Sequence, residues 1–340
     1  MKPLAKGIFI TGAVLFLFVV LSVFLHPVSR EAGAPDPPAS AGNPEGITIA
    51  TDSAEKGDVT ISMYDHRSKK LVRLPLEEYL VGVVAGEMPA SFDSEALKSQ
   101  AVAARTLAVG QMRSFGGSGC SQNEGADVCS SFAHCQEWIS EDQMRKNWGN
   151  DFEANHEKIK QAVTETKGEI MTYNGKPIEV LYYSTSNGKT EEASEVFSRS
   201  LPYYTSVEST GEEDAPNFEG SVTYTNQRFT EIFQSRYHIK LNPDNLKSEI
   251  KINGYTESGR IRDLTVGGKN LKATEFRLLY DLNSTDINFV FDKDSITMKT
   301  KGFGHGVGMS QVGADRMAKR GDSYKDILLH YYQGVEIKHY

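Results

Sequence analysis

One glutamate of this chain stands in a setting suited to proton transfer. Glu87 follows an apolar stretch, has Val84, Met88 and Phe92 as neighbours, and precedes Pro89, which should end the helix that carries it. Apolar surroundings disfavour the charged form of a carboxyl and raise its pKa, and an acid that donates a proton near neutral pH needs this. The alternative is a helix-terminal glutamate that faces water.

Three cysteines and a histidine form a second candidate group. Cys120, Cys129, His134 and Cys135 all lie in a short polar segment. Three thiolates and an imidazole complete a tetrahedral zinc site, whereas an odd number of cysteines also permits one disulfide with a free thiol, or three free thiols. We expect zinc, in a closed structural site that is separate from Glu87, with the disulfide as the alternative.

Two further segments carry polar groups suited to a sugar. Thr185 to Gly188 supplies hydroxyls and an amide that can bond sugar hydroxyls and acetamido groups, although an ordinary polar turn has the same composition. Gly304 to Gly308 is glycine-rich and precedes a helix that Ser310 can cap, but it lacks the lysine of a phosphate-binding loop. His305 within it either faces a ligand or is a buried structural histidine.

Four ordered segments resemble the motifs of the stage II sporulation protein D family. They are Glu77 to Val109, Thr185 to Phe197 with Leu201 to Val207, Ala273 to Thr285, and Gly302 to Ala318. The resemblance covers residues 57–338.

This resemblance implies a lytic transglycosylase that cuts the bond between N-acetylmuramic acid and N-acetylglucosamine and leaves a 1,6-anhydro-muramic end. The implied substrate is peptidoglycan glycan already stripped of stem peptides by a sporulation cell-wall amidase, and further partners are the membrane anchor proteins of the engulfment machinery. The catalytic acid falls on Glu87. It can act alone, because the C6 hydroxyl of the substrate attacks C1 and no second carboxylate has to activate water.

Two other functions are compatible with parts of this sequence. A non-enzymatic glycan-binding module that stimulates an amidase is the main alternative, because the family includes amidase-enhancer relatives. A hydrolase that uses Ser310 and His305 is not expected, since no nucleophile elbow surrounds Ser310.

The resemblance also implies which residues bind substrate. Arg105 and Tyr203 match functional positions of the family, although a salt bridge on a helix surface is the alternative for Arg105, and Thr205 stands where many relatives carry lysine. No cofactor is implied for catalysis. Some relatives carry a zinc near Cys129, His134 and Cys135, and Cys120 is our extrapolated fourth ligand. The candidate substrate-binding residues are Gln100, Arg105, Tyr183, Ser184, Ser186, Asn187, Tyr203, His305, Ser310 and Gln311.

The elements that must position these residues predict an α+β fold of mixed, mainly antiparallel strands with packed helices. Val59, Ile61 and Met63 alternate with polar residues, which predicts a strand paired with residues 71–74. Pro75 opens a helix that ends before Pro89, and Asp93 caps the next. We further predict helices at 152–167, around 229–233 and at 323–333, a hairpin of 170–173 with 178–184 around Asn174-Gly175, and turns at Asn253-Gly254 and Gly267-Gly268.

The first residues predict a membrane anchor. Gly7 to Leu25 carries no charge and is long enough to cross a bilayer, and Lys2 and Lys6 before it favour a cytoplasmic N-terminus. A cleaved signal peptide, with Ala32-Gly33-Ala34 as its site, is the alternative. We therefore predict a cytoplasmic tail (1–6), a single transmembrane anchor (7–26), a flexible linker rich in proline (27–56) and a peptidoglycan-cleaving domain (57–340). The anchor would lie in the engulfing membrane of the mother cell, and the domain would lie outside the cytoplasm.

The overall charge excludes one class of partner. The net charge is −8, and no run of lysine and arginine occurs along the 340 residues. Nucleic acid is therefore not an expected partner.

Overall fold

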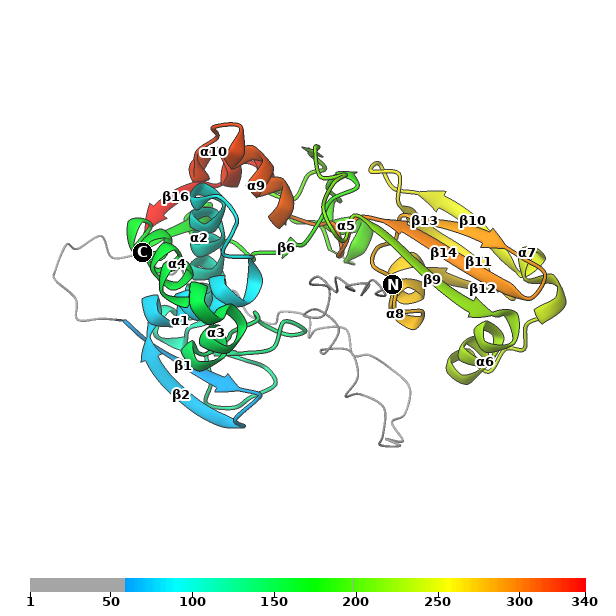
Figure 1. Cartoon of the computed structure of the whole chain (residues 1–340), viewed down its shortest axis with the longest axis horizontal. Coiled ribbons are helices and arrows are strands. Elements are labelled where there is room, and N and C mark those ends of the chain that lie inside the picture. Colours follow the sequence, from blue (N-terminus) through cyan, green and yellow to red (C-terminus); the bar gives the residue numbers. More distant parts are fainter. Residues whose placement is uncertain (1–58, 198) are drawn as a thin grey trace, which may run out of the picture. The chain divides into compact units, whose positions relative to one another are not determined.

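A strand hairpin and one helix lead directly to Glu87. The computed structural model describes residues 59–197 and 199–340 (Figure 1). Thr60–Asp65 (β1) and Lys70–Pro75 (β2) pair antiparallel, with Ile61 and Met63 buried as their alternation predicts. Leu76–Glu87 (α1) starts directly after Pro75, whose fixed φ suits the position before a helix, and it buries most of its residues.

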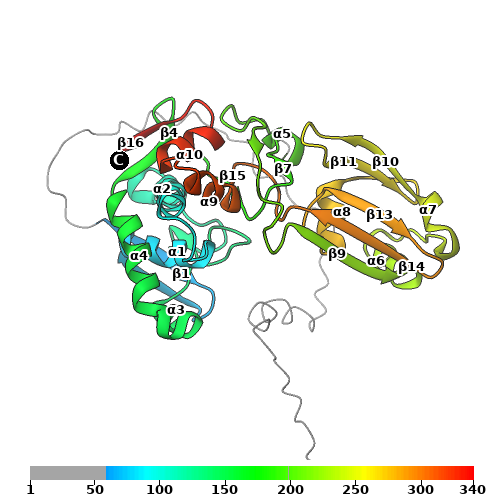
Figure 2. The same ribbon diagram turned by 45° about the horizontal axis from the view of Figure 1, so that its top comes forward.

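The second helix lies at the centre of the first hydrophobic core. Ser94–Gln111 (α2) is capped by Asp93, whose side chain accepts from the Glu95 N–H, and it buries a row of small residues that includes Ala101, Ala104 and Ala108. Phe152–Glu165 (α4), Gln311–Lys319 (α9) and Tyr324–Tyr331 (α10) pack around it. Both views show the C-terminal helices α9 and α10 beside α2, so segments from opposite ends of the described chain share one core (Figures 1 and 2).

Short strands complete this part of the fold. Glu169–Tyr173 (β4) pairs antiparallel with Lys176–Pro177 (β5) on one side and Glu336–His339 (β16) on the other. Gly188–Lys189 (β7) pairs with Glu208–Ser209 (β8). Two pairs are parallel: Val128–Cys129 (β3) lies beside β1, and Tyr182–Tyr183 (β6) lies beside Met309–Ser310 (β15). The remaining helices here are Glu141–Trp148 (α3) and Ala193–Val196 (α5).

The residues between β8 and β15 build a second hydrophobic core. One sheet has the order β13-β14-β9 and is made of Ile287–Phe291, Ser295–Lys301 and Glu219–Thr225. The other has the order β10-β11-β12 and is made of Ile250–Tyr255, Ile261–Val266 and Lys269–Lys272. The helices of this part are Asn226–Tyr237 (α6), Leu246–Glu249 (α7) and Ala273–Leu279 (α8). Phe229, Phe276 and Tyr280 are fully buried at the centre of this core.

The α+β prediction is confirmed, with local corrections. The hairpin after α4 closes at Asn174-Gly175 as predicted, but its second strand is only Lys176–Pro177, because residues 182–183 pair with β15 instead. The predicted turn at Asn253-Gly254 is wrong: β10 continues through it with a shifted register, and the chain turns after Tyr255. A bulge needs the same glycine freedom as a turn, so the residues alone do not separate the two.

The predicted tail, anchor and linker (1–6, 7–26 and 27–56) lie outside the described residues. Within residues 59–197 and 199–340, no helix has both the length and the apolar character that a membrane crossing requires.

Candidate active site and metal centre

Glu87 is the last residue of α1, and its side chain is half-buried. The Met88 N–H still bonds the Val84 carbonyl oxygen at 3.0 Å, and Pro89 then stops the helix. The Glu137 main-chain N–H donates to Glu87 Oε1 at 2.7 Å. The side chains of Tyr182 and Gln311 also reach this carboxyl.

The surroundings of this carboxyl favour its protonated form. Burial raises the pKa of Glu87 to about 7, and the negative charge of Glu137 adds to the rise. The Glu137 N–H, which donates to the carboxyl, and the nearby Gln311 amide lower the pKa without cancelling the effect of burial. Glu87 therefore exchanges its proton near neutral pH, as its apolar setting in the sequence predicts.

The parallel pairing of β6 with β15 brings two distant segments to Glu87. Met309 lies opposite Tyr182 in this pairing, and Gln311 starts α9 directly after β15. Ser310 caps α9 by accepting the Gly313 N–H at 3.1 Å. The Nε2 of Gln311 is buried and has no hydrogen bond of ordinary geometry within the described residues, although the side chain lies near enough to Glu87 to favour its carboxylate.

A second buried carboxyl ties the same segments together. Glu212 Oε2 accepts the Ser186 N–H at 2.8 Å and the Ser310 hydroxyl at 2.7 Å, and Glu212 Oε1 accepts the Ser209 hydroxyl at 2.6 Å. The Ser209 hydroxyl also bonds the Tyr331 hydroxyl at 2.7 Å. Burial raises the pKa of Glu212 to about 7, with the hydroxyl and N–H donors acting against it. Two sequence-predicted residues, Ser186 and Ser310, thus meet at a carboxyl that the sequence did not indicate.

His305 is held as a neutral imidazole. The Val307 N–H donates to His305 Nδ1 at 3.1 Å, so the ring proton lies on Nε2. Burial lowers the pKa of His305 to about 4, and nearby arginines add to this effect. The ring contacts those of Tyr183 and Phe197, with centroids 5.7 Å away in each case. His305 and Tyr183 therefore lie together, and His305 carries no charge at neutral pH.

The segment after β6 is held mainly by polar contacts within the chain. Asn187 Nδ2 donates to Asp286 Oδ2 at 2.9 Å, while its buried Oδ1 has no partner in the described residues. The Ser184 carbonyl oxygen accepts the Val312 N–H at 3.0 Å, which ties this segment to α9. Asn187 Oδ1 is thus the sequence-predicted group in this segment that is left without a partner.

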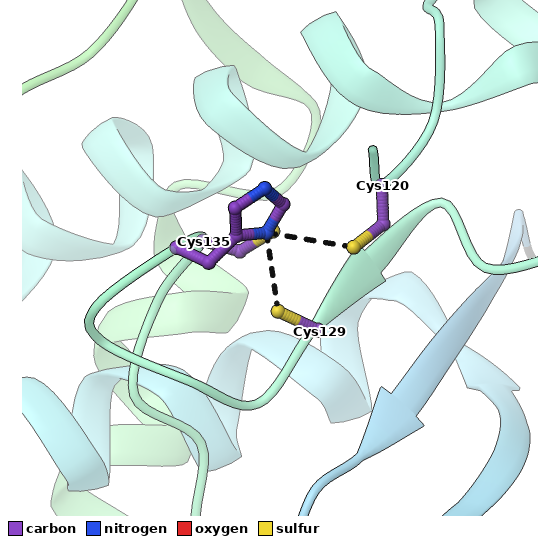
Figure 3. A group of neighbouring side chains, drawn as sticks. Cys120, Cys129 and Cys135 are labelled. Atoms are coloured by element: carbon purple, nitrogen blue, oxygen red, sulfur yellow. Dashed lines mark hydrogen bonds between the residues drawn. The ribbon is translucent and has the colours of Figure 1, made fainter. Parts of the chain in front are cut away.

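The three thiols and the imidazole meet in one cluster (Figure 3). His134 Nδ1 lies 3.5, 3.4 and 3.2 Å from the sulfurs of Cys120, Cys129 and Cys135, and the four ligand atoms lie within 4.8 Å of one another. A tetrahedral zinc ion with usual bond lengths separates sulfur from nitrogen by about 3.6 Å, so the four groups fit this ion. The second ring nitrogen of His134 bonds the Ser121 hydroxyl at 2.9 Å, as expected for a metal-binding histidine. All three cysteines are unpaired.

Glu87 is not one of the four residues of the cluster, but a short segment connects the two. Cys135 is two residues before Glu137, whose N–H bonds the Glu87 carboxyl. The same short segment therefore ends the loop that carries the cysteines and supports the carboxyl.

Comparison with known proteins decides the family. The family model described as Stage II sporulation protein matches residues 64–173. The chain is 37% identical to stage II sporulation protein D of Bacillus subtilis (strain 168), over 99% of this chain and 96% of that protein, and 35% identical to the protein of the same name from Bacillus amyloliquefaciens over the same shares. The amidase enhancer of Bacillus subtilis is 29% identical over 77% of this chain and 40% of that protein. The chain belongs to the stage II sporulation protein D family.

Of the ten substrate-binding residues predicted for this family member, Gln311 alone is among the contacts that the described residues make with Glu87. Arg105 is fully buried and pairs with both carboxylate oxygens of Glu77, at 3.0 and 2.6 Å. The Tyr203 hydroxyl accepts the Glu179 N–H at 3.1 Å. Gln100 is fully buried on α2, and both of its amide atoms lack a partner in the described residues. The substrate-binding roles of these three residues stay predictions, and the contacts of Arg105 are those of a structural ion pair.

The sequence reading missed three groups at this family site. The sequence indicates Tyr183 rather than Tyr182, yet adjacent residues of a strand point to opposite faces and Tyr182 is the one that reaches Glu87. Glu137 contributes through its main chain, which no residue type can reveal. Glu212 lies outside the motifs and carries no local signal.

We predict that Glu212→Ala lowers the free energy of unfolding by about 2–4 kcal/mol, because it leaves the buried Ser186 N–H and Ser310 hydroxyl without their acceptor. Glu212→Gln should cost less than about 1 kcal/mol, since its amide oxygen can accept from both groups while its NH₂ donates to Ser209. Urea unfolding of the two variants measures the difference, with exposed Glu213→Ala as the matched control.

The stability difference between wild type and Glu212→Gln should also depend on pH. The pKa of Glu212 rises from 4.5 to about 7 on folding, so the native state binds this proton more tightly than the unfolded chain. Wild type should therefore lose stability relative to Glu212→Gln as the pH rises through this interval. Equal losses in the alanine and glutamine variants at every pH contradict the role given to Glu212.

Proposed function

We propose that this protein is a lytic transglycosylase that cleaves the bond between N-acetylmuramic acid and N-acetylglucosamine in peptidoglycan glycan strands. The observation that carries the proposal is the setting of Glu87, a half-buried carboxyl with a pKa raised to about 7 and only neutral donors bonded to it. A general acid works best when its pKa lies near the operating pH.

The proposed reaction needs one carboxyl in two roles. Glu87 gives its proton to the glycosidic oxygen as the bond from C1 to that oxygen breaks. The C6 hydroxyl of the same muramic residue attacks C1, and its proton passes to the Glu87 carboxylate, which restores the acid. No water is consumed. The Glu137 N–H and the Gln311 amide favour the carboxylate that exists between the two transfers.

A two-carboxylate mechanism has weaker support. Glycosidases that hydrolyse the bond use a second carboxylate as nucleophile or as base for water. The acidic side chain of Glu137 lies near Glu87, but it forms an ion pair with Arg67. A carboxylate held by a guanidinium is a poor nucleophile and a poor base, so the single-acid route fits these residues better.

We propose denuded glycan as the substrate and a cell-wall amidase as the enzyme that supplies it. The relative named amidase enhancer supports a connection with amidases in this family. The predicted anchor at residues 7–26 would hold the domain outside the cell membrane, at the mother-cell engulfing membrane, where the anchor proteins of the engulfment machinery are the further proposed partners. The alternative function, a glycan-binding module that stimulates an amidase, needs no acid at Glu87.

We predict that Glu87→Gln lowers the rate of cleavage of denuded glycan by about 10²–10⁴-fold, because it keeps the shape of the side chain but has no proton to give. Mass spectrometry of the products should detect 1,6-anhydro-muramic ends with wild type and not with the variant. Intact peptidoglycan should be cleaved more slowly than the amidase-treated material.

Glu78→Gln is the matched control, since Glu78 lies on the same helix and is exposed. Binding of glycan by Glu87→Gln should match wild type. Cleavage by the Glu87→Gln variant at the wild-type rate would contradict the assignment of Glu87 as the acid. The absence of anhydro ends from wild-type digests would favour the glycan-binding module.

The pKa of Glu87 sets a second prediction. The acid must be protonated before it donates, so kcat/KM should fall about tenfold per pH unit above pH 7, with its midpoint near the pKa of about 7. Steady-state assays between pH 5 and 9 measure this limb, and the Glu78→Gln control should show the same midpoint. A rate that stays constant from pH 6 to 9 contradicts proton donation by this group.

We also propose a structural zinc ion at the cysteine cluster. Cys120, Cys129 and Cys135 would supply thiolates and His134 its Nδ1, which fills four positions and leaves none for substrate. The ion would cross-link a loop whose own apolar core is small: besides Cys120 and Cys129, only Ala126 is a fully enclosed member of it. Binding energy at such a site contributes directly to the folding of the loop.

We predict about one zinc per chain in protein purified without added metal, and none in Cys129→Ser, because three remaining ligands hold the ion weakly. Elemental analysis measures the metal, and hydrogen exchange should show faster opening of residues 120–139 in the variant. Cleavage should fall but not vanish, because Glu87 itself is unchanged. Phe132→Ala, an exposed change in the same loop, should keep both metal and protection. Metal-free wild type with one disulfide contradicts the zinc site.

A further inference from the structure

The segment that follows the metal cluster lies along the second half of α1. The Ile139 N–H bonds the Gly82 carbonyl oxygen at 3.2 Å, and the Glu137 N–H bonds Glu87 Oε1 at 2.7 Å. A Cβ at Gly82 would lie 2.1 Å from Trp138 Nε1, and one at Gly86 would lie 3.1 Å from the Glu137 main-chain oxygen. Two glycines one helical turn apart thus allow this segment to run against the helix that carries the acid.

Within this segment, the amide of Gln136 can take only one orientation. The side chain is fully buried, and its Nε2 lies 3.4 Å from the Ala104 carbonyl oxygen and 3.1 Å from the Tyr79 hydroxyl. A carbonyl oxygen only accepts, so the NH₂ group must face Ala104 and the amide oxygen must face the other way. That oxygen lies 3.0 Å from the Tyr182 hydroxyl.

The orientation of Gln136 determines where the hydroxyl proton of Tyr182 points. An amide oxygen has no proton to give, so the proton in this bond belongs to Tyr182. With that proton turned to Gln136, the Tyr182 oxygen has only lone pairs for Glu87, and a lone pair accepts from a protonated carboxyl. When the hydroxyl turns to Glu87 instead, it donates and stabilises the carboxylate. A single proton cannot make both bonds.

We propose that Gln136 is a positioning residue that acts through Tyr182: it accepts the Tyr182 hydroxyl proton, presents the Tyr182 oxygen to Glu87 as an acceptor, and so favours the protonated form of Glu87. The Ala104 carbonyl oxygen fixes the orientation of the Gln136 amide. The Gln136 amide oxygen in turn fixes where the Tyr182 hydroxyl proton points, and so which atom Tyr182 presents to Glu87. This inference rests on the proposed role of Glu87, but the proton equilibrium that it describes exists with or without cleavage.

The other groups around Glu87 leave this equilibrium open to Gln136. Glu137, on the same segment, adds a negative charge that Arg67 partly offsets, and Gln311 from α9 is neutral. Burial raises the pKa of both Tyr79 and Tyr182, so these hydroxyls stay neutral across the working range. The thiols of Cys129 and Cys135 also lie near enough to act on Tyr79, and burial raises the pKa of both thiols.

The test compares pH profiles of variants of the full chain. Gln136→Met keeps the length of the side chain and removes the acceptor, so the Tyr182 proton turns to Glu87 and favours its carboxylate. The basic limb of kcat/KM should move to lower pH by about 0.5–1 unit, which is about the effect of one hydrogen bond. Activity should fall about three- to tenfold on that limb and stay near wild type at pH 5. A merely structural defect would lower the rate equally at every pH. Gln143→Met, at a solvent-accessible glutamine of α3, is the matched control.

A double-mutant cycle tests whether Gln136 acts through Tyr182. In a Tyr182→Phe background no hydroxyl proton remains to be directed, so Gln136→Met should cause no further shift. Gln136→Glu keeps an acceptor and adds negative charge, so it should move the limb upward, and it serves if the methionine variant does not fold. Circular dichroism and metal content check each variant, since Gln136 directly follows Cys135. An unshifted limb, or equal shifts with and without the Tyr182 hydroxyl, overturns the proposal.

Direct titration separates this proposal from the proposed function. Carbon-13 NMR of labelled glutamate carboxyls, with Glu87 assigned by Glu87→Gln, reports its proton equilibrium without any substrate. A lower pKa of Glu87 in Gln136→Met supports the hydrogen-bond chain even if no glycan is cleaved, and an unchanged pKa refutes it even if cleavage occurs.

Discussion

This site depends on one physical constraint: the carboxyl group of Glu87 is buried and no positively charged group is bonded to it. Desolvation raises the free energy of the charged form, and hydrogen bonds from neutral groups recover only part of it. At Glu87 the partners are a main-chain N–H, a tyrosine and a glutamine, none of which brings a positive charge. The proton therefore stays on the carboxyl until near pH 7, and every element that encloses Glu87 contributes to that result.

The enclosure is built from segments that are far apart in the sequence. α1 supplies Glu87, the segment after the metal cluster supplies the Glu137 N–H, β6 supplies Tyr182 and α9 supplies Gln311. The parallel pairing of β6 with β15 joins the last two, and the packing of α9 on α2 places them over the end of α1. Because these are long-range contacts, the environment of the acid forms only when the chain from α1 to α10 is folded. A defect in the cysteine loop or at Glu212 should then reach Glu87 through the elements it anchors.

The features that could be predicted from the sequence depend on interactions between residues close together in the chain. Proline at each end of α1, the Asp93 cap of α2 and the alternation in β1 act over a few residues, and so the start of the fold and the position of Glu87 can be read from the sequence. The meeting of the three cysteines with His134 could also be predicted, because these residue types close together in the sequence are typical of a metal site. Tyr182 and Glu212 are not, since the pairing of a two-residue strand decides the first and the meeting of three loops decides the second. For Arg105 the salt bridge that was the alternative is present, but in the interior rather than on a helix surface.

Four glutamates of this chain show how the partner, more than the residue, decides what a buried carboxyl can do. Glu77 and Glu191 each meet an arginine, Arg105 and Arg260, and a carboxylate in such a pair serves the fold. Glu212 and Glu87 are bonded by hydroxyl, amide and main-chain donors, and burial raises the pKa of both to about 7. Access separates these last two. Glu212 is 1% exposed and has hydrogen bonds on both oxygens, so its proton can move only within the protein. Glu87 is half-buried, and its carboxyl accepts from the Glu137 main chain at Oε1. It is thus the one of the four that combines a proton held to neutral pH with a partly exposed side chain, which the proposed acid role requires.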